Sequence, residues 1–200
     1  MVIWINGAFG AGKTQAAYEL RRRAENAYVY DPENAGYFIR NNLPASACIG
    51  NFQDYPMWRM VNVEMLRYIL EHHEGDVIVP MTITRREYYE EIIGRLSEEY
   101  DVKHVILSAE KKTLLRRLAF RMEGRRSWAA QQIDRCITAF DGNIPGHQIP
   151  TDHMNINQVV EAIAAAVGIS ISADDRSVLR RWFDRCAVQC GSIRWPGSTF

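Results

Sequence analysis

The 200-residue sequence predicts an α/β fold, in which helices cover both faces of a parallel sheet of about five strands. Two observations support this class. Short apolar runs alternate along the chain with stretches of helical periodicity, as parallel strands joined by helical crossovers require. The first apolar run also leads directly into a glycine-rich turn that opens a helix, an arrangement typical of three-layer α/β proteins.

Five segments have the composition of strands. Residues 2–6 form a continuous apolar run, and the runs at 27–31 (AYVYD) and 76–82 (DVIVPMT) also read as buried. The other two lie at 102–108 (VKHVILS) and 147–150 (HQIP). A helical pattern separates each strand from the next, so we expect helices on both sides of the sheet.

Helices are predicted between these strands, over residues 14–23 and 34–41. A longer helix begins at Pro56, a favoured residue at the first helical position, and ends near Gly75. Its apolar face is predicted to consist of Trp58, Val61, Met65 and Ile69.

The composition limits the class of protein. Hydrophobic residues make up 47% and charged residues 24%, as in an ordinary globular chain. Because 24 basic residues balance 24 acidic ones, the sequence indicates no nucleic acid partner. Neither a signal peptide nor an apolar stretch of membrane-spanning length is recognisable, so we expect a cytoplasmic location. We expect a domain over residues 1–168, with residues 169–200 adding a C-terminal amphipathic helix and tail to it.

The glycine-rich turn GAFGAGKT, residues 7–14, fits the P-loop pattern G-x-x-x-x-G-K-[ST] and lies between a strand and a helix, as that motif requires. Its backbone N–H groups would surround phosphate oxygens, Lys13 would reach the β and γ phosphates, and the Thr14 hydroxyl would hold Mg²⁺. The predicted cofactors are therefore ATP and Mg²⁺. The predicted ATP-binding residues here are Gly7, Ala8, Phe9, Gly10, Ala11, Gly12, Lys13 and Thr14.

Asp31 ends the second predicted strand and thus lies at the sheet edge where open α/β sheets bind ligands. It is a candidate catalytic base for an attacking hydroxyl, and it also fits a role in orienting Mg²⁺ through water. The alternative is a helix cap for the segment that follows. The third strand has no acidic residue at its C-terminal end, which disfavours a motor-type NTPase.

An arginine-rich stretch follows the fourth strand. Arg117 and Arg121 lie four residues apart on one helical face, and Arg125 and Arg126 follow in a glycine-containing break. We interpret residues 121–128 as a lid that closes over the triphosphate, with Arg121 as a catalytic residue. A solvated basic face is the alternative.

These features in this order resemble the P-loop kinases of the nucleoside-monophosphate, shikimate and gluconate type. The sequence is most similar to the tunicamycin-resistance ATP-binding protein (TmrB-like) family, on the stretches WINGAFGAGKTQ, VYDPE, DYPMWR, VPMTI, EIIGRL and SWAAQQIDRC. The resemblance implies an ATP-binding protein that protects a bacterium against tunicamycin, a nucleoside antibiotic. It also implies that Arg117 flanks adenine, that Arg121 touches the transferred phosphate and that Asp152 borders the base.

The acceptor pocket is less clearly indicated. Where shikimate-type kinases carry a glycine run after the third strand, this chain has Pro80-Met81-Thr82. The pocket lining is predicted to consist of the helical segment after Asp31, with Arg40, and of the stretch 51–59 (NFQDYPMWR). The guanidinium, amide and indole groups of these segments suit a polar ligand with a planar ring, although aromatic residues at helical spacing are more often core. The predicted substrate-binding residues are Arg40, Gln53, Trp58, Arg59 and Thr82.

The end of the chain carries an amphipathic pattern. Ser172 with Asp175 three positions later fits a capping box and predicts a helix over about residues 173–193. Its apolar stripe consists of Leu179, Trp182, Phe183, Cys186, Cys190 and Ile193. Such a stripe usually packs on its own domain or on a partner subunit. Since arginines flank it, peripheral contact of residues 174–194 with the inner face of a membrane is the second interpretation.

Two functional classes follow from the sequence. The first is a transferase that moves the γ-phosphoryl group of ATP onto a small molecule such as a nucleoside antibiotic. Asp31 would then act as the base, while Lys13 and Arg121 stabilise the developing charge. The second is an ATP-dependent protein that sequesters the drug without chemistry. A kinase of an unidentified metabolite remains a third reading.

Overall fold

The computed structural model describes residues 1–121, 124 and 127–192. Within these residues a five-stranded sheet has the order β2-β3-β1-β4-β5, and all its pairings are parallel. The strands are β1 (Val2–Gly7), β2 (Tyr28–Val29), β3 (Val77–Pro80), β4 (Val102–Ser108) and β5 (His147–Pro150). The predicted α/β class and the parallel sheet are confirmed.

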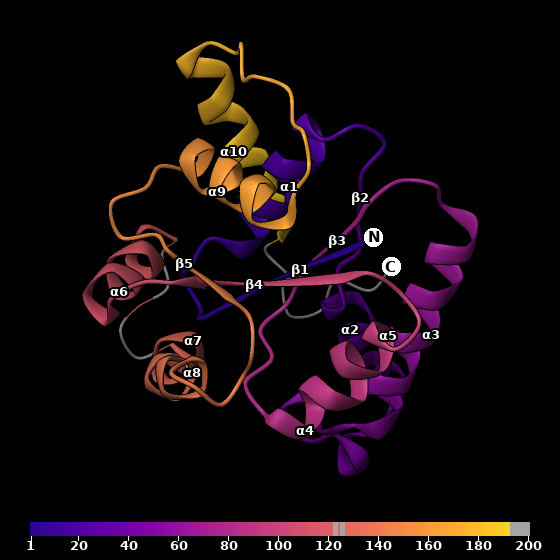
Figure 1. The fold of residues 1–200 in the computed structure, drawn as a ribbon. Coiled ribbons are helices and arrows are strands. Elements are labelled where there is room, and N and C mark those ends of the chain that lie inside the picture. Colours follow the sequence, from indigo (N-terminus) through magenta and orange to yellow (C-terminus); the bar gives the residue numbers. More distant parts are fainter. Residues whose placement is uncertain (122–123, 125–126, 193–200) are drawn as a thin grey trace.

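Helices lie on both faces of this sheet, with α1, α9 and α10 above it and α2, α3, α4 and α5 below it in the view of Figure 1. The α-helices are α1 (Lys13–Arg23), α2 (Glu33–Asn42), α3 (Pro56–His72), α4 (Arg86–Tyr89), α5 (Arg95–Ser97), α6 (Lys111–Phe120), α7 (Trp128–Gln131), α8 (Ile133–Phe140), α9 (Ile156–Val167) and α10 (Val178–Ser192). Short turns of other helix types are η1 (Ala45–Ala47), η2 (Phe52–Asp54) and the π-helix η3 (Glu90–Gly94).

Two hydrophobic clusters follow from the alternation of side chains along β1. Ile3 and Ile5 belong to the cluster that packs against α1 and α9. Val2 and Trp4 point to the opposite face, into the cluster shared with α2 and α3. Because both faces are covered, every residue of β1 is buried, and the P-loop begins from a rigid strand.

The face of α3 differs from the prediction. Trp58 is fully buried as expected, but Val61 and Met65 are 42% and 44% exposed. The buried face instead carries Arg59, Asn62, Val63 and Leu66. Asn62 can occupy it because its amide donates to Trp58 O and its carbonyl accepts from the Tyr30 hydroxyl. The prediction is wrong by about one position, since it counted only apolar side chains.

The edge strand β2 is shorter and more exposed than expected. It comprises two residues, and Tyr28 is 44% exposed. The prediction that this segment is buried is therefore wrong at Tyr28, since an outermost strand is paired on one side only.

The last helix begins later than the capping box predicted. Ser172 does not cap it, because both its backbone N–H and its hydroxyl donate to Arg23 O at the end of α1. The chain therefore runs past α1 without regular structure, and α10 starts at Val178. Arg176 holds this segment in place through ion pairs with Glu19, Asp174 and Asp184. The side chains of Cys190 and Ile193 lie outside the described set.

The first two turns of α10 keep their large apolar side chains on the surface. Leu179, Trp182 and Phe183 are 71%, 54% and 61% exposed, so they do not pack on the described part of this chain. None of the described helices is both long and apolar enough to cross a bilayer.

Candidate active site

The P-loop connects β1 to α1 and takes a conformation that its glycines make possible. Gly7, Gly10 and Gly12 have φ values of 143°, 84° and 98°. A Cβ at Gly10 would lie 2.8 Å from Leu114 O, so this position excludes any side chain. The N-terminus of α1 has neither a side-chain cap nor an acidic residue in its first turn. Its amide groups and the positive end of the helix dipole therefore suit an anion.

Lys13 turns back over this loop. Its ammonium group donates to Gly7 O at 3.0 Å and Ala8 O at 3.1 Å, and it lies 5.5 Å from the ring centre of Phe9. Burial lowers the pKa of Lys13 to about 8, opposed by the nearby acidic groups of Cys136 and Glu33. A phosphate group placed in the loop would supply the negative charge that a buried ammonium lacks.

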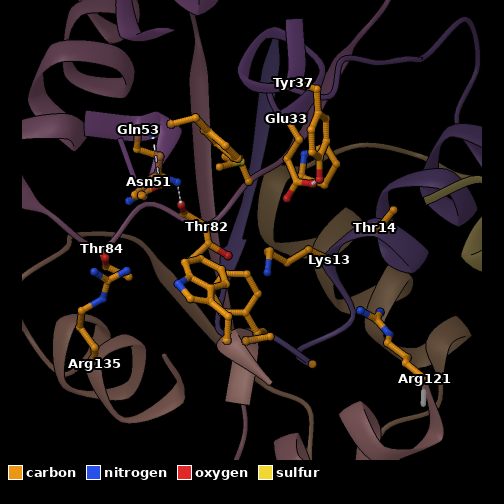
Figure 2. A pocket seen from close by; sticks show the side chains of 18 of the residues that line it. Lys13, Thr14, Glu33, Tyr37, Asn51, Gln53, Thr82, Thr84, Arg121 and Arg135 are labelled. Atoms are coloured by element: carbon orange, nitrogen blue, oxygen red, sulfur yellow. Dashed lines mark hydrogen bonds between the residues drawn. The ribbon is translucent and has the colours of Figure 1, made fainter. Parts of the chain in front are cut away.

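A cavity of about 440 Å³ opens beside the P-loop at the carboxyl ends of β1 and β3 (Figure 2). Its walls come from the P-loop, α2, the 50–53 segment, the end of β3, the end of α6, and α7 and α8. The lining residues are Phe9, Gly10, Gly12, Lys13, Thr14, Glu33, Tyr37, Arg40, Gly50, Asn51, Phe52, Gln53, Pro80, Met81, Thr82, Thr84, Arg121, Trp128, Ala129 and Arg135.

The charges in this cavity are unbalanced. Four basic side chains line it, whereas Glu33 is its one acidic residue within the described part of the chain. The basic residues are Lys13, Arg40, Arg121 and Arg135. Because the whole chain carries no net charge, this local excess makes the cavity a site for anions.

The carboxylate that faces the cavity is Glu33 rather than Asp31. Asp31 is not among the lining residues, and its Oδ1 accepts a hydrogen bond of 3.0 Å from Glu33 N at the start of α2. This contact from residue i to residue i+2 is an Asx turn that leads into α2. The N-cap of α2 is Pro32, which has no side-chain cap hydrogen bond. Figure 2 shows the Glu33 side chain extending toward Lys13, with the Tyr37 hydroxyl 3.5 Å from Glu33 Oε2. The role of Asp31 as a base stays a prediction.

The five predicted substrate-binding residues fall into two groups. Arg40, Gln53 and Thr82 line the cavity. Two of them are already engaged, since Gln53 Nε2 donates to Thr82 O at 2.7 Å and the Thr82 hydroxyl donates to Gly7 O at 2.8 Å. These bonds connect the 50–53 segment, the end of β3 and the P-loop, so they fix the shape of the cavity wall.

Trp58 and Arg59 do not reach the cavity lining. Trp58 is fully buried and its indole N–H donates to Pro32 O at 3.0 Å. Arg59 forms an ion pair of 2.5 Å with Glu91 and donates to Gln53 O at 2.6 Å. Both side chains therefore stabilise the residues next to the cavity rather than contact the cavity itself.

Arg121, at the end of α6, lines the cavity and lowers the pKa of Lys13 through like charge. Arg117 does not line it, because its guanidinium donates to Thr151 Oγ1 and Thr151 O. Asp152, also outside the lining, accepts bonds of 3.0 and 3.2 Å from Glu110 N. Arg117 and Asp152 thus lie close together beyond β5. Arg125 and Arg126 lie outside the described residues.

Several lining residues were missed by sequence reasoning. Glu33 lies only two residues after the predicted Asp31. Trp128 is the last residue of the predicted lid, and Arg135 lies in the stretch SWAAQQIDRC that carries the family likeness, but neither was singled out as a site residue. Trp128 packs edge-on against Phe9 of the P-loop at 5.1 Å between ring centres, a contact that spacing in sequence does not indicate. Tyr37, in the helical segment after Asp31, and Asn51 and Phe52, in the stretch 51–59, lie in segments that were predicted to line the pocket, although they were not singled out. Thr84 had no sequence signal.

Asn6, the residue before the P-loop, is a further position without a sequence signal. Its Oδ1 accepts from Gly7 N at 2.8 Å and from Ile83 N at 3.0 Å, and its amide donates to Ile83 O. This buried side chain holds the first P-loop residue and the segment after β3 at a fixed separation.

The described residues contain no group of three or more His, Cys, Asp or Glu side chains arranged to hold a metal ion. The Thr14 hydroxyl lines the cavity at the N-terminus of α1. This hydroxyl fits the predicted Mg²⁺ site, because in such sites the phosphates of the nucleotide supply most of the protein-bound metal's ligands.

Comparison with solved structures places this fold among P-loop kinases. The chain is similar to the Deinococcus radiodurans tunicamycin resistance protein, with a TM-score of 0.73 and 29% identity over 86% of this chain and 99% of the other. A sugar kinase from Janibacter sp. HTCC2649 matches with a TM-score of 0.63 and 14% identity, over 84% and 95% of the two chains. Shikimate kinase from Bacteroides thetaiotaomicron gives 0.58 and 16%, over 84% and 99%.

The last two likenesses show the fold alone. The first confirms the resemblance that the sequence motifs indicated. No protein-family model matches the chain, and neither does any curated protein.

Proposed function

Starting from the P-loop kinase fold, we propose that this chain binds ATP with Mg²⁺ and transfers the γ-phosphoryl group to a hydroxyl group of a small molecule. A nucleoside antibiotic of the tunicamycin type is the candidate acceptor that the resemblance to the tunicamycin resistance protein supports. The proposal depends mainly on one observation: the carboxylate of Glu33 and the ammonium of Lys13 line the same cavity, beside the P-loop.

The donor side uses the P-loop. Its amides and Lys13 hold the phosphates, the Thr14 hydroxyl contributes to Mg²⁺, and Arg121 neutralises charge on the group in transfer. Mg²⁺, when bound, draws negative charge away from the β and γ phosphate oxygens. The adenine ring would lie near Arg117 and Asp152, as the family likeness implies, and the lid proposed over residues 121–128 would cover the phosphates.

The chemistry on the acceptor side needs one proton acceptor. The acceptor hydroxyl gives its proton to Glu33, its oxygen forms a bond to the γ phosphorus, and the bond from that phosphorus to the bridging oxygen breaks to release ADP. Glu33 is better placed for this than Asp31 because it lines the cavity. Asp31 remains the alternative base, or a residue that orients Mg²⁺ through water.

The deciding experiment incubates the protein with MgATP and tunicamycin and analyses the drug by mass spectrometry. Phosphotransfer predicts a product heavier by one phosphoryl group together with one ADP per product. Glu33→Gln should retain ATP binding but form little product. If no drug product appears while ATP-dependent drug binding is tight, sequestration replaces phosphotransfer as the function.

A kinase of an unidentified metabolite is the remaining class. It predicts ADP release on addition of small-molecule cell extract and none on addition of tunicamycin. The same Glu33→Gln variant serves as the control, since ADP formed by ATP hydrolysis that does not use Glu33 would appear equally with both proteins.

We place the protein in the cytoplasm, with peripheral contact to the inner face of the membrane through residues 174–194. Support comes from the exposed apolar residues Leu179, Trp182 and Phe183 and from the exposed Arg180 on the same helix. Flotation with anionic vesicles tests it. Replacement of the three apolar residues by serine should abolish flotation, and equal flotation of both proteins would exclude this helix as the contact.

A further inference from the structure

We infer that His104 on β4 is a positioning residue for the P-loop, which acts through Asn6 on the first residue of the loop, Gly7. This inference goes beyond the proposed transfer reaction and rests on the proposed function only for the identity of the ligand that the loop binds. His104 does not line the cavity. It lies on the strand beside β1, opposite Trp4 in the register, and its ring reaches the side chain of Asn6.

The side chain of Asn6 is fully buried and uses every hydrogen-bonding position that an amide has. Its Oδ1 accepts from Gly7 N at 2.8 Å and from Ile83 N at 3.0 Å. Its Nδ2 donates one hydrogen to Ile83 O at 3.0 Å and the other to Nε2 of His104 at 3.2 Å. Because backbone N–H groups can only donate, the two bonds to Oδ1 fix which end of the amide faces Gly7.

The imidazole of His104 is held in one tautomer by its two partners. Nδ1 lies 2.6 Å from Pro145 O, which can only accept, so Nδ1 carries the hydrogen. Nε2 faces the Nδ2 of Asn6, which can only donate, so Nε2 is the acceptor. Burial lowers the pKa of His104 to about 4, which keeps Nε2 unprotonated at neutral pH. The ring of Tyr89 packs against the imidazole at 5.4 Å between ring centres.

The turn before β5 allows Pro145 O to approach this ring closely. Residue 146 is a glycine, and a Cβ there would lie 2.9 Å from Nδ1 of His104 and 2.9 Å from Cδ1 of Ile106. A side chain at this position would therefore displace the imidazole or the turn. His104 thus connects two backbone segments that are distant in the chain, the turn at residues 145–146 and the start of the P-loop.

The peptide groups on both sides of Gly7 are held by hydrogen bonds. The residue has a φ of 143°, a conformation that favours glycine, and its N–H donates to Asn6. Its carbonyl accepts from the Thr82 hydroxyl at 2.8 Å and from Nζ of Lys13 at 3.0 Å. When Lys13 turns to a bound phosphate it gives up this bond, so Asn6 and Thr82 then hold Gly7 without it.

Removal of the acceptor at His104 would act on the P-loop through this chain of bonds. Asn6 would keep a buried N–H without a partner, which costs free energy that rotation of the amide relieves. That rotation breaks the bond to Gly7 N and lets the first residue of the loop move. We therefore expect weaker phosphate binding, although no group that lines the cavity has been changed.

Two amide substitutions separate the roles of the two ring nitrogens. His104→Gln places an oxygen near the position of Nε2 and keeps an acceptor for Asn6. His104→Asn places an amide nitrogen near the position of Nδ1 and keeps only the donor to Pro145 O. Calorimetry with MgADP should show affinity about tenfold weaker in His104→Asn and nearly unchanged in His104→Gln. His147→Phe, which changes an exposed histidine on β5 outside the cavity lining, should alter nothing.

A purely structural role of His104 predicts the reverse order. If the ring only anchors the turn before β5, His104→Asn should bind MgADP like the unmodified protein and His104→Gln should bind it more weakly. That order, or equal affinities of the two variants, would overturn the inference. NMR of the ring nitrogens in the unmodified protein is a second measurement, which does not depend on the folding of a variant. A neutral ring with hydrogen on Nδ1 is expected at neutral pH, and hydrogen on Nε2 would overturn the inference.

Failure of the proposed function gives a different result. Binding of MgADP needs no acceptor, so the comparison of variants holds in a protein that transfers no phosphoryl group. If the chain binds no nucleotide, the backbone amide resonances of Gly7 and Ile83 are recorded by NMR instead. Shifts of both resonances in His104→Asn, but not in His104→Gln, would support the positioning role without a nucleotide. Resonances that shift in neither variant would overturn it.

Discussion

The two halves of the cavity are built in different ways. The phosphate half is one continuous loop, residues 7–14, whose shape is set by backbone dihedral angles and by the helix that follows. The acceptor half is assembled from α2, the 50–53 segment, the end of β3, α7 and α8, and side-chain hydrogen bonds such as Gln53 to Thr82 O hold it together. In the proposed reaction, the nucleotide would therefore bind a loop whose backbone conformation leaves little freedom to vary, whereas the acceptor would bind a wall that single substitutions can reshape.

The largest effect is expected in the phosphate half, at Lys13. Lys13→Met should lower phosphotransfer by about 1000-fold, because it removes a positioned charge from the group in transfer. Its affinity for a non-hydrolysable ATP analogue, measured by calorimetry, should fall as well. Lys112→Met, which changes an exposed lysine on α6 outside the cavity, is the matched control. Similar activity of Lys13→Met and Lys112→Met would show that the P-loop lysine takes no part in the reaction.

A substitution at Glu33 tests the acceptor half without changing the P-loop, since this side chain faces Lys13 from the acceptor side. Glu33→Gln should lower kcat by about 100-fold through loss of the proton acceptor. The KM for ATP should stay near that of the unmodified protein, because the P-loop is unchanged.

Asp31→Asn is the informative partner of this variant. Its side chain can still accept the bond from Glu33 N, so we expect little change in kcat. A larger loss of kcat in Asp31→Asn than in Glu33→Gln would make Asp31 the base, as the sequence alone predicted. Steady-state kinetics on both proteins decide between them.

The difference between the halves also explains what the sequence could predict. The P-loop was identified with its strand and helix because its glycines act locally, through positive φ angles and close backbone contacts. The parallel sheet followed from apolar runs separated by helices. The acceptor residues needed the tertiary structure, because Arg40 and Arg135 meet one cavity although 95 positions separate them in the chain.

The differences between the predicted and the observed positions of polar and aromatic residues share a physical cause. Trp58 and Arg59 looked suited to a ligand, but hydrogen bonds to Pro32 O and Gln53 O show that both satisfy groups inside the protein. On α3, buried Asn62 could not be recognised as a core residue without its partners Tyr30 and Trp58. A polar side chain is placed by its partner, and partners distant in sequence are not visible in a local pattern.

A substitution at Gly36 should affect the acceptor half alone. A Cβ at this position of α2 would lie 2.6 Å from Cγ of Phe52, so Gly36→Ala must displace that ring. Because Phe52 lines the cavity and lies under Arg40, we expect kcat/KM for the acceptor to fall about tenfold, with unchanged ATP affinity.

Gly94→Ala controls for the change of a glycine in a helical segment. The nearest atom to the added Cβ there is Oε2 of Glu90, at 2.7 Å, which belongs to the end of a flexible side chain. Neither Gly94 nor Glu90 lines the cavity. We expect wild-type kinetics from it. A fall in ATP affinity with Gly36→Ala, measured on the same preparations, would show that the two halves are coupled after all.

The smallest effect is a pH dependence of the phosphate half. Burial lowers the pKa of Lys13 to about 8, whereas a bound polyphosphate stabilises the ammonium and raises that pKa. Binding therefore takes up a proton above pH 8, and nucleotide affinity falls as the pH rises, by about threefold between pH 7.5 and 8.5. Calorimetry in buffers of different ionisation enthalpy measures both the affinity and the proton uptake. Lys112→Met should keep this pH dependence, and Lys13→Met should lose it. If the nucleotide affinity of the unmodified protein is constant between pH 7.5 and 8.5, the Lys13 ammonium is fully charged before the nucleotide binds.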